Sequence, residues 1–399
     1  MKTMKQSIEN YETFSLVLFE KMKHQNPGIG RMELYEFRYC LNNLTPPDGW
    51  DSLLLESPVE LEKMTASRSF FDGIQIKPRK DSRLVLDDKI LWLTRILLAG
   101  LYTGFYSGEW VLKYFYFDIR GFLFMCRTEY FTDEVKNHLG EKPFREFTPR
   151  QSAFDSLQDV GYQEFKEANR EVDEVFIDTI VKLINIKGSP LLIAIAGPTA
   201  AGKTEITERL REIVEKSRKK TAAIELDNFL TDREGRETKG IFTQGREALH
   251  FELLMQSLHD ICRGKTIQIP RYDFIVATSS HDDAGNLKSD GVPITIEPAD
   301  IIFIEGNFPF LIEEVAQMIT VKVVYLTDDP VRMKRKWKRD IDYRKKYDPN
   351  YFCNRYFKDQ HIMAEIAYRP QLAKCDIAVD TTGARLWLTP EISELLTWE

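Results

Sequence analysis

The chain has 399 residues, a formal net charge of −7 and 43% hydrophobic residues. This length allows two or three domains with sizeable cores. The negative net charge predicts no general attraction to nucleic acid or to anionic lipid. Its five cysteines lack metal-type spacing, which argues against a zinc site and favours a reducing, cytoplasmic compartment. The N-terminus has no signal-peptide pattern, and the apolar segment 90–106 predicts a buried helix rather than a membrane span.

The first 186 residues are expected to form a separate N-terminal α+β domain, mostly helical and of unknown role. Helical periodicity between residues 11 and 40 is broken at Asn26-Pro-Gly28, and a further helix is expected over 84–106. Aromatic residues crowd 110–131, which predicts a hairpin turning at 118–121. They indicate either a packed core or an aromatic ligand surface, and the core is favoured. One or two helices are expected over 154–186.

The second domain is predicted to span residues 187–399. It begins at Lys187-Gly-Ser-Pro190, where Gly and Pro punctuate the chain. Short apolar runs then alternate with helical patterns, and this order predicts an α/β fold with a parallel sheet and flanking helices. The expected strands are 191–196, 222–226, 300–304, 321–326 and 376–379. Ligands of such sheets bind beyond the carboxyl ends of the strands.

The strongest motif follows the first of these strands. It reads Gly-Pro-Thr-Ala-Ala-Gly-Lys-Thr and opens a helical pattern, which is the context of a phosphate-binding loop rather than a chance match. Its glycines permit a tight turn whose N–H groups face phosphate oxygens, the lysine adds a full charge, and the threonine hydroxyl can bind Mg²⁺. The predicted nucleotide-binding residues are Gly197, Pro198, Thr199, Ala200, Ala201, Gly202, Lys203, Thr204 and Glu205.

Two acidic residues stand at the ends of later strands. Asp227 is placed to orient and deprotonate an attacking hydroxyl, although an Asp there can also cap the next element. Glu305 is expected to hold Mg²⁺, the alternative being a solvated carboxylate. These residues predict a site for Mg²⁺ and ATP, with ATP as the phosphoryl donor.

A basic run over 331–346 follows the fourth strand. Alone, it is typical of a solvated helix face or a nucleic-acid patch. Behind a phosphate loop, a lid that stabilises the charge of phosphoryl transfer is favoured, with Arg335, Lys336 and Arg339 as its residues.

Residues 190–380 resemble the uridine kinase/phosphoribulokinase family of P-loop kinases. The resemblance rests on the phosphate loop, on Leu226-Asp-Asn-Phe229 and on the segments 253–273, 299–306 and 335–340. It implies a P-loop NTPase fold, catalytic roles for Asp227, Lys203 and Arg339, and a metal site of Thr204, Asp227 and Glu305. The implied substrate-binding residues are Phe229, Arg271, Tyr272, Asp273, Phe274 and Arg344.

The acceptor is less well defined by the resemblance. Uridine kinases read the nucleoside with a His and an Arg, and the equivalent positions here are Ala277 and Ser279. His281 is a candidate substitute, but an exposed loop histidine is the favoured interpretation.

Two functional hypotheses follow. The first is an ATP-dependent kinase acting on a hydroxyl of a nucleoside, a pentose or a related small acceptor. The second is a nucleotide-gated regulatory protein whose N-terminal domain is the output. Nucleic-acid binding through the basic run is disfavoured by the net charge, and formation of a homo-oligomer is left open.

Overall fold

The computed structural model describes residues 10–25, 33–71, 77–80, 83–85, 87–118, 123–126, 128–148, 169–241, 245–327, 332, 335–336, 339 and 362–397. Four expectations fall outside these residues: the break at 26–28, the position of Arg344, the turn after residue 118 and any helix over 154–168. Of the basic run 331–346, the structure describes residues 332, 335–336 and 339.

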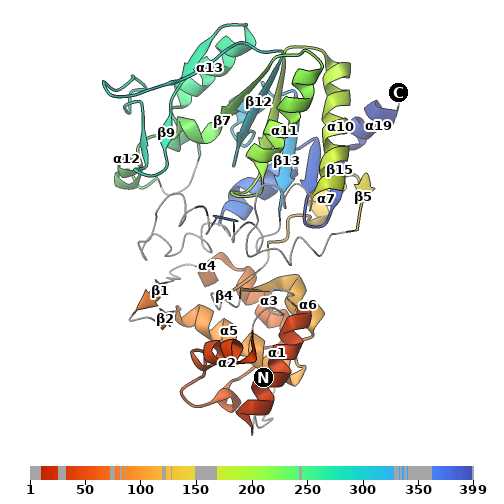
Figure 1. Ribbon diagram of the computed structural model, residues 1–399, viewed down its shortest axis with the longest axis vertical. Helices are drawn as coiled ribbons and strands as arrows, with labels where there is room; N and C mark the ends of the chain where they lie inside the picture. Colours follow the sequence, from red (N-terminus) through yellow and green to blue (C-terminus); the bar gives the residue numbers. More distant parts are fainter. Residues whose placement is uncertain are drawn as a thin grey trace.

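A seven-stranded sheet forms the centre of the C-terminal half (Figure 1), in the order β5-β15-β14-β13-β6-β12-β7. Five adjacent strands are mutually parallel, as the sequence predicts: β14, β13, β6, β12 and β7. Two antiparallel strands, β15 and β5, extend one edge and were not predicted. The strand bounds are β5 (Arg145–Glu146), β6 (Leu191–Ala196), β7 (Thr221–Glu225), β12 (Ile301–Gly306), β13 (Val321–Leu326), β14 (Ile377–Asp380) and β15 (Arg385–Leu388).

Helices cover both faces of the sheet, so every residue of the central strands β6 and β12 is buried. This explains why these strands are continuous apolar runs instead of alternating ones. One face packs against α10 (Arg170–Lys187), α11 (Lys203–Lys216) and α19 (Pro390–Thr397). The other packs against α7 (Asp133–Leu139), α13 (Phe251–Cys262) and α14 (Glu313–Ala316).

Short elements surround the carboxyl ends of the strands. They are η3 (Leu226–Phe229), α12 (Arg233–Thr238), η4 (Arg246–Ala248), η6 (Ala364–Tyr368) and α18 (Arg369–Leu372). Two small antiparallel pairs project beside them: β8 (Ile267–Ile269) with β11 (Ile294–Ile296), and β9 (Tyr272–Asp273) with β10 (Thr278–Ser279).

The N-terminal half has a hydrophobic core of its own, built from residues 14–115. Its helices are α1 (Tyr11–Gln25), α2 (Leu34–Asn42), η2 (Trp50–Ser52), α3 (Pro58–Ala66), α4 (Arg68–Phe71), α5 (Asp88–Thr103) and α6 (Gly108–Tyr114). Its hairpins are β1 (Lys77–Lys80) with β2 (Arg83–Val85), and β3 (Phe115–Asp118) with β4 (Leu123–Cys126). The predicted helical character is confirmed, and β3 pairs with β4 in the aromatic segment as expected. None of the described helices is long and apolar enough to cross a membrane.

Some residues that precede position 187 pack onto the sheet instead of onto the N-terminal core. Val135 and Leu139 of α7 join the core beneath the sheet, and β5 pairs with β15. The side chain of His138 donates from Nε2 to the carbonyl oxygen of Cys375 over 2.7 Å. The domain boundary at 187 stays a prediction, while these contacts place α7, β5 and α10 with the sheet.

Candidate active site

The loop between β6 and α11 turns sharply, and glycine is required at both of its ends. A Cβ added at Gly197 would lie 2.2 Å from the carbonyl oxygen of Tyr325, and Gly202 has φ of 105°. The side chain of Lys203, the residue after Gly202, folds back over the loop. Its Nζ donates to the carbonyl oxygens of Gly197 (2.9 Å) and Pro198 (3.0 Å). The ammonium group therefore lies at the mouth of the loop, where a phosphate would meet it.

Glu305 faces the first turn of α11 from the end of β12. The hydroxyl of Thr204 donates to Glu305 Oε1 over 2.9 Å, and Glu305 as a whole is 5% exposed. Burial raises the pKa of Glu305 to about 7, a shift that the charge of Lys203 opposes and that of Glu225 reinforces. The effect of Glu225 on this pKa follows from the parallel register, because Glu305 of β12 pairs with Glu225 of β7.

Asp227, in η3, exerts an electrostatic effect on both Lys203 and Glu305. Burial lowers the pKa of Lys203, while the charges of Glu305 and Asp227 oppose that shift and the charge of Arg339 adds to it. The structure therefore brings Lys203, Asp227, Glu305 and Arg339 together at the carboxyl end of the sheet. Sequence reasoning missed Glu225, and the available signal was its position at the end of the strand that leads to Asp227.

Mg²⁺ fits this corner of the site. Within the described part of the chain, no group forms a hydrogen bond to the buried second oxygen of Glu305, Oε2. A buried carboxylate oxygen without a donor is costly unless a cation or a donor reaches it. Mg²⁺ is commonly held by one or two protein oxygens together with phosphate and water, and Thr204 and Glu305 offer such oxygens.

Three arginines of the basic run contact the phosphate loop from outside. Arg339 Nη2 donates to Thr199 Oγ1 over 2.9 Å. Arg332 and Arg335 donate from Nη1 to the carbonyl oxygens of Thr199 and Ala200, each over 3.4 Å. Arg332 is fully buried and also approaches the hydroxyl of Tyr130, at 3.5 Å. Lys336 lies on the same segment and is partly exposed.

The expected substrate-binding residues differ in their exposure to solvent. Phe229 has no exposed surface and packs in the core beneath η3, whereas Asp273 and Arg271 are exposed. Asp273 Oδ1 accepts from the N–H groups of Ile275 and Val276, so it stabilises the β9–β10 turn. Tyr272 is buried, contacts Phe274 edge-on with ring centroids 5.1 Å apart, and its hydroxyl accepts from Arg236.

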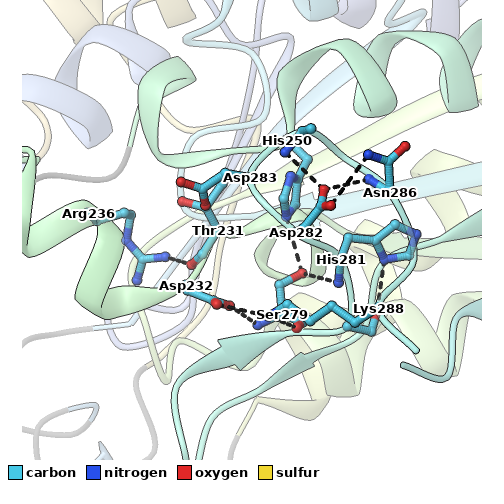
Figure 2. A network of polar contacts seen from close by, with 12 residues as sticks. Thr231, Asp232, Arg236, His250, Ser279, His281, Asp282, Asp283, Asn286 and Lys288 are labelled. Carbon is cyan, nitrogen blue, oxygen red and sulfur yellow. Dashed lines mark hydrogen bonds and ion pairs between the residues drawn. The ribbon is translucent and has the colours of Figure 1, made fainter. Parts of the chain in front are cut away.

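A polar network joins this hairpin to the start of α12 and to the start of α13 (Figure 2). Ser279 receives a hydrogen bond from its neighbour His281 N, lies 3.2 Å from His250 Nε2, and donates from its own N–H to Asp232. Lys288 binds both Asp232 Oδ2 (2.8 Å) and the carbonyl oxygen of Ser279 (2.9 Å).

The expectation of an exposed His281 is wrong. His281 is 7% exposed, its Nδ1 lies 2.9 Å from the Ser280 hydroxyl, and its backbone bridges to Leu287. Ala277 and Ser279 are also buried.

Thr327, directly after β13, also contacts the loop. The hydroxyl of Thr327 donates to the carbonyl oxygen of Ala201 over 2.8 Å and lies 2.7 Å from the Thr381 hydroxyl. Thr381, in the turn after β14, is therefore linked to the phosphate loop through Thr327.

The parallel sheet and the phosphate loop define a P-loop nucleotide-binding fold. Residues 192–386 match the model of the phosphoribulokinase/uridine kinase family. The chain is 30% identical over 165 residues to uridine-cytidine kinase 2-B of Danio rerio, which covers 39% of this chain and 59% of that protein. It is also 30% identical over 156 residues to a uridine kinase of Macrococcus caseolyticus, covering 38% of this chain and 70% of that one.

The chain therefore belongs to the phosphoribulokinase/uridine kinase family. Among solved structures, phosphoribulokinase from Rhodobacter spheroides aligns with a TM-score of 0.35 and 16% identity, covering 49% of this chain and 70% of that one. The match to the family model does not include the N-terminal half.

Proposed function

We propose that the protein is an ATP-dependent kinase that transfers the γ-phosphate to a hydroxyl of a small acceptor. The observation that carries this proposal is the convergence of Lys203, Asp227 and Glu305 on the phosphate loop. Family membership supports a reaction of this class.

Each group has a task in this reaction. The loop amides and the Lys203 ammonium bind the β- and γ-phosphates. Asp227 orients the acceptor hydroxyl and takes its proton as the oxygen bonds to the γ-phosphorus, while the bond from that phosphorus to the bridging oxygen breaks and ADP leaves. Thr204 and Glu305 would hold Mg²⁺, which would supply charge neutralisation to the phosphates. Arg339 leaves the Thr199 hydroxyl and binds the oxygens of the transferring group.

The acceptor site lies between η3 and the β9–β10 hairpin. Because Ala277 and Ser279 are buried small residues, no long polar side chain reaches out from the positions that read a nucleoside in uridine kinases. A pocket without those hydrogen-bonding groups discriminates a base weakly. We therefore propose a pentose, a nucleoside or a related hydroxyl compound as the acceptor class.

A coupled ATPase screen tests this function. Nucleosides, pentoses, pentose phosphates and hydroxy acids are each added to the protein with Mg·ATP, with Lys203→Ala as the blank. We expect one acceptor class to raise ATP consumption, and the variant to lower turnover by roughly 10²-fold or more. ATP consumption that no acceptor raises would contradict a kinase and favour the nucleotide-gated regulatory hypothesis.

A further inference from the structure

Two buried threonine hydroxyls meet behind the phosphate loop, at the carboxyl ends of the paired strands β13 and β14. Thr327 directly follows β13 and is 1% exposed, and Thr381 directly follows β14 and is 5% exposed. Thr327 Oγ1 donates to the carbonyl oxygen of Ala201 over 2.8 Å, and the two hydroxyl oxygens lie 2.7 Å apart. Thr327 lies 126 positions after Ala201 and 54 before Thr381, so only the fold brings the three residues together.

The direction of the bond between the two hydroxyls follows from their protons. A threonine hydroxyl carries one proton, and a carbonyl oxygen carries none. Because the proton of Thr327 is donated to Ala201, the proton between the two hydroxyls belongs to Thr381. Thr381 therefore donates to Thr327, and Thr327 donates to the loop. The hydroxyl of Thr381 thus fixes the direction in which Thr327 donates.

The turn that carries Thr381 is itself held in place by backbone hydrogen bonds. The N–H of Thr381 donates to the carbonyl oxygen of Leu326 over 3.0 Å. The carbonyl oxygen of Ala384 accepts from the N–H of Phe147 over 2.9 Å, and Phe147 follows β5, before the matched residues begin at 192. Thr381 is therefore a fixed point against which the side chain of Thr327 is oriented.

The phosphate loop needs support at this position. Ala200 has φ of 61°, a left-handed conformation that a residue with a Cβ seldom adopts unless its surroundings hold it there. Ala201 follows it and has no exposed surface. The carbonyl of Ala201 and the N–H of Gly202 belong to one planar trans peptide group, so they point in opposite directions. A carbonyl that bonds Thr327 therefore directs the Gly202 N–H away from β13.

We propose that Thr381 is a positioning residue for the phosphate loop. Its hydroxyl directs Thr327 towards the carbonyl of Ala201, and that bond turns the Gly202 N–H towards the phosphates of a bound nucleotide. The proposal rests on the proposed function, in which the loop binds Mg·ATP. It adds to the loop two residues that lie outside its contiguous motif, at the ends of two other strands.

A double-mutant cycle tests this role, with titration calorimetry of Mg²⁺ and a non-hydrolysable ATP analogue as the measurement. Thr381→Val keeps the shape of the side chain and removes the hydroxyl, and we expect it to weaken binding about 5-fold. Thr381→Ser keeps the hydroxyl and should stay within about 2-fold of the wild type. Thr327→Val should weaken binding about 10-fold, and adding Thr381→Val should then change it by less than about 2-fold, because its target is already gone.

Controls separate positioning from a general loss of stability. Thr94→Val is the matched control, because the buried hydroxyl of Thr94 also donates to a carbonyl oxygen, that of Ile90, over 2.7 Å, but lies on α5 in the N-terminal half. We expect Thr94→Val to lower the Tm about as much as Thr381→Val does, and to leave the affinity unchanged. If Thr381→Val does not fold, Thr381→Ala replaces it in the cycle with the same expectations.

The outcomes distinguish this proposal from the proposed function. Three results would overturn the role of Thr381 alone: wild-type affinity in a folded Thr381→Val, a loss that Thr381→Ser shares, or losses that multiply in the double variant. A wild type that binds the analogue but phosphorylates no acceptor would contradict the proposed kinase, while the binding data still decide the role of Thr381. A wild type that does not bind the analogue would overturn both.

Discussion

Gly197 lies where the phosphate loop leaves β6, against the backbone of the neighbouring strand β13. The Tyr325 carbonyl oxygen occupies the space that any Cβ would need, at 2.2 Å. Backbone cannot move aside as a flexible side chain can. Glycine is therefore required at position 197 by close packing as well as by the conformation of the turn.

Gly197→Ala should displace the loop from the strand. We expect Mg·ATP affinity to fall by about 10-fold or more, with a lowered Tm, because strain in a tightly packed backbone costs on the order of 1–3 kcal/mol. Titration calorimetry and thermal unfolding measure the two effects. Gly245→Ala is the control, since nothing lies within 4 Å of a Cβ there. Equal affinities for both variants and the wild type would contradict the loop's assignment.

Thr204→Val removes the hydroxyl that bonds Glu305 and keeps the side-chain shape. We expect the Mg²⁺ concentration for half-maximal activity to rise about 10-fold, because both the metal ligand and the orientation of Glu305 are lost. A magnesium titration at fixed ATP measures it. Thr207→Val is a matched control on the same helix, because among the described residues no partner bonds the buried Thr207 hydroxyl. Similar titration curves for the two variants would argue against a metal at Thr204.

At the scale of elements, the hairpin β9–β10 depends on two buried histidines. Burial is the main cause that lowers the pKa of both His250 and His281. His250 faces His281, Asp232, Asp282 and Asp283, while Asp282 and Lys288 face His281. Their rings lie 6.2 Å apart, so protonating both would place two positive charges in one small network.

The hairpin should therefore loosen in acid. A histidine whose folded pKa is lowered binds fewer protons in the folded state, so its stabilising effect is present above pH 6.5 and is lost as the pH falls through the folded pKa. Hydrogen-exchange protection factors for residues 267–296 should fall between pH 7.5 and 5.5, while those of α11 change less. The double variant His250→Gln/His281→Gln should lose this difference. Protection that does not depend on pH in the wild type would rule out the histidines as its source.

Several elements were predictable from the sequence because their signals are local. The central strands β6 and β12 are nearly continuous apolar runs, and the phosphate loop is a contiguous motif set by turn geometry. The strands β5 and β15 were not predictable, since β5 has two residues and its partner is 239 positions away. The same holds for Thr327, whose partners Ala201 and Thr381 lie 126 and 54 positions away along the chain. Burial of His281 also depends on contacts that its polar sequence neighbours do not reveal.

At the scale of the whole molecule, the sheet depends on residues from both halves of the chain. The helix α10 buries six large apolar side chains against it: Val172, Phe176, Ile177, Ile180, Leu183 and Ile184. At about 1.5–3 kcal/mol each, their burial amounts to roughly 9–18 kcal/mol, comparable with the net stability of a whole domain at about 5–15 kcal/mol.

A chain cut at the predicted boundary should therefore be unstable. We expect residues 188–399 to aggregate or to unfold at a much lower temperature, because they lack α7, β5 and α10. Residues 128–399 should keep the sheet covered and bind Mg·ATP. Soluble yield, thermal unfolding and nucleotide affinity compare the two. Equal stability of both fragments would place the boundary at 187 after all.

The most direct test of the central claim follows the phosphate itself. Protein is incubated with ATP labelled at the γ-phosphate, Mg²⁺ and the acceptor that raises ATP consumption, and the label is located in the products. We predict that it appears on a hydroxyl of the acceptor, and that Asp227→Asn lowers the rate by roughly 10²-fold or more while the protein still binds ATP. Label released only as inorganic phosphate, or full transfer by Asp227→Asn, would contradict the assignment of this site.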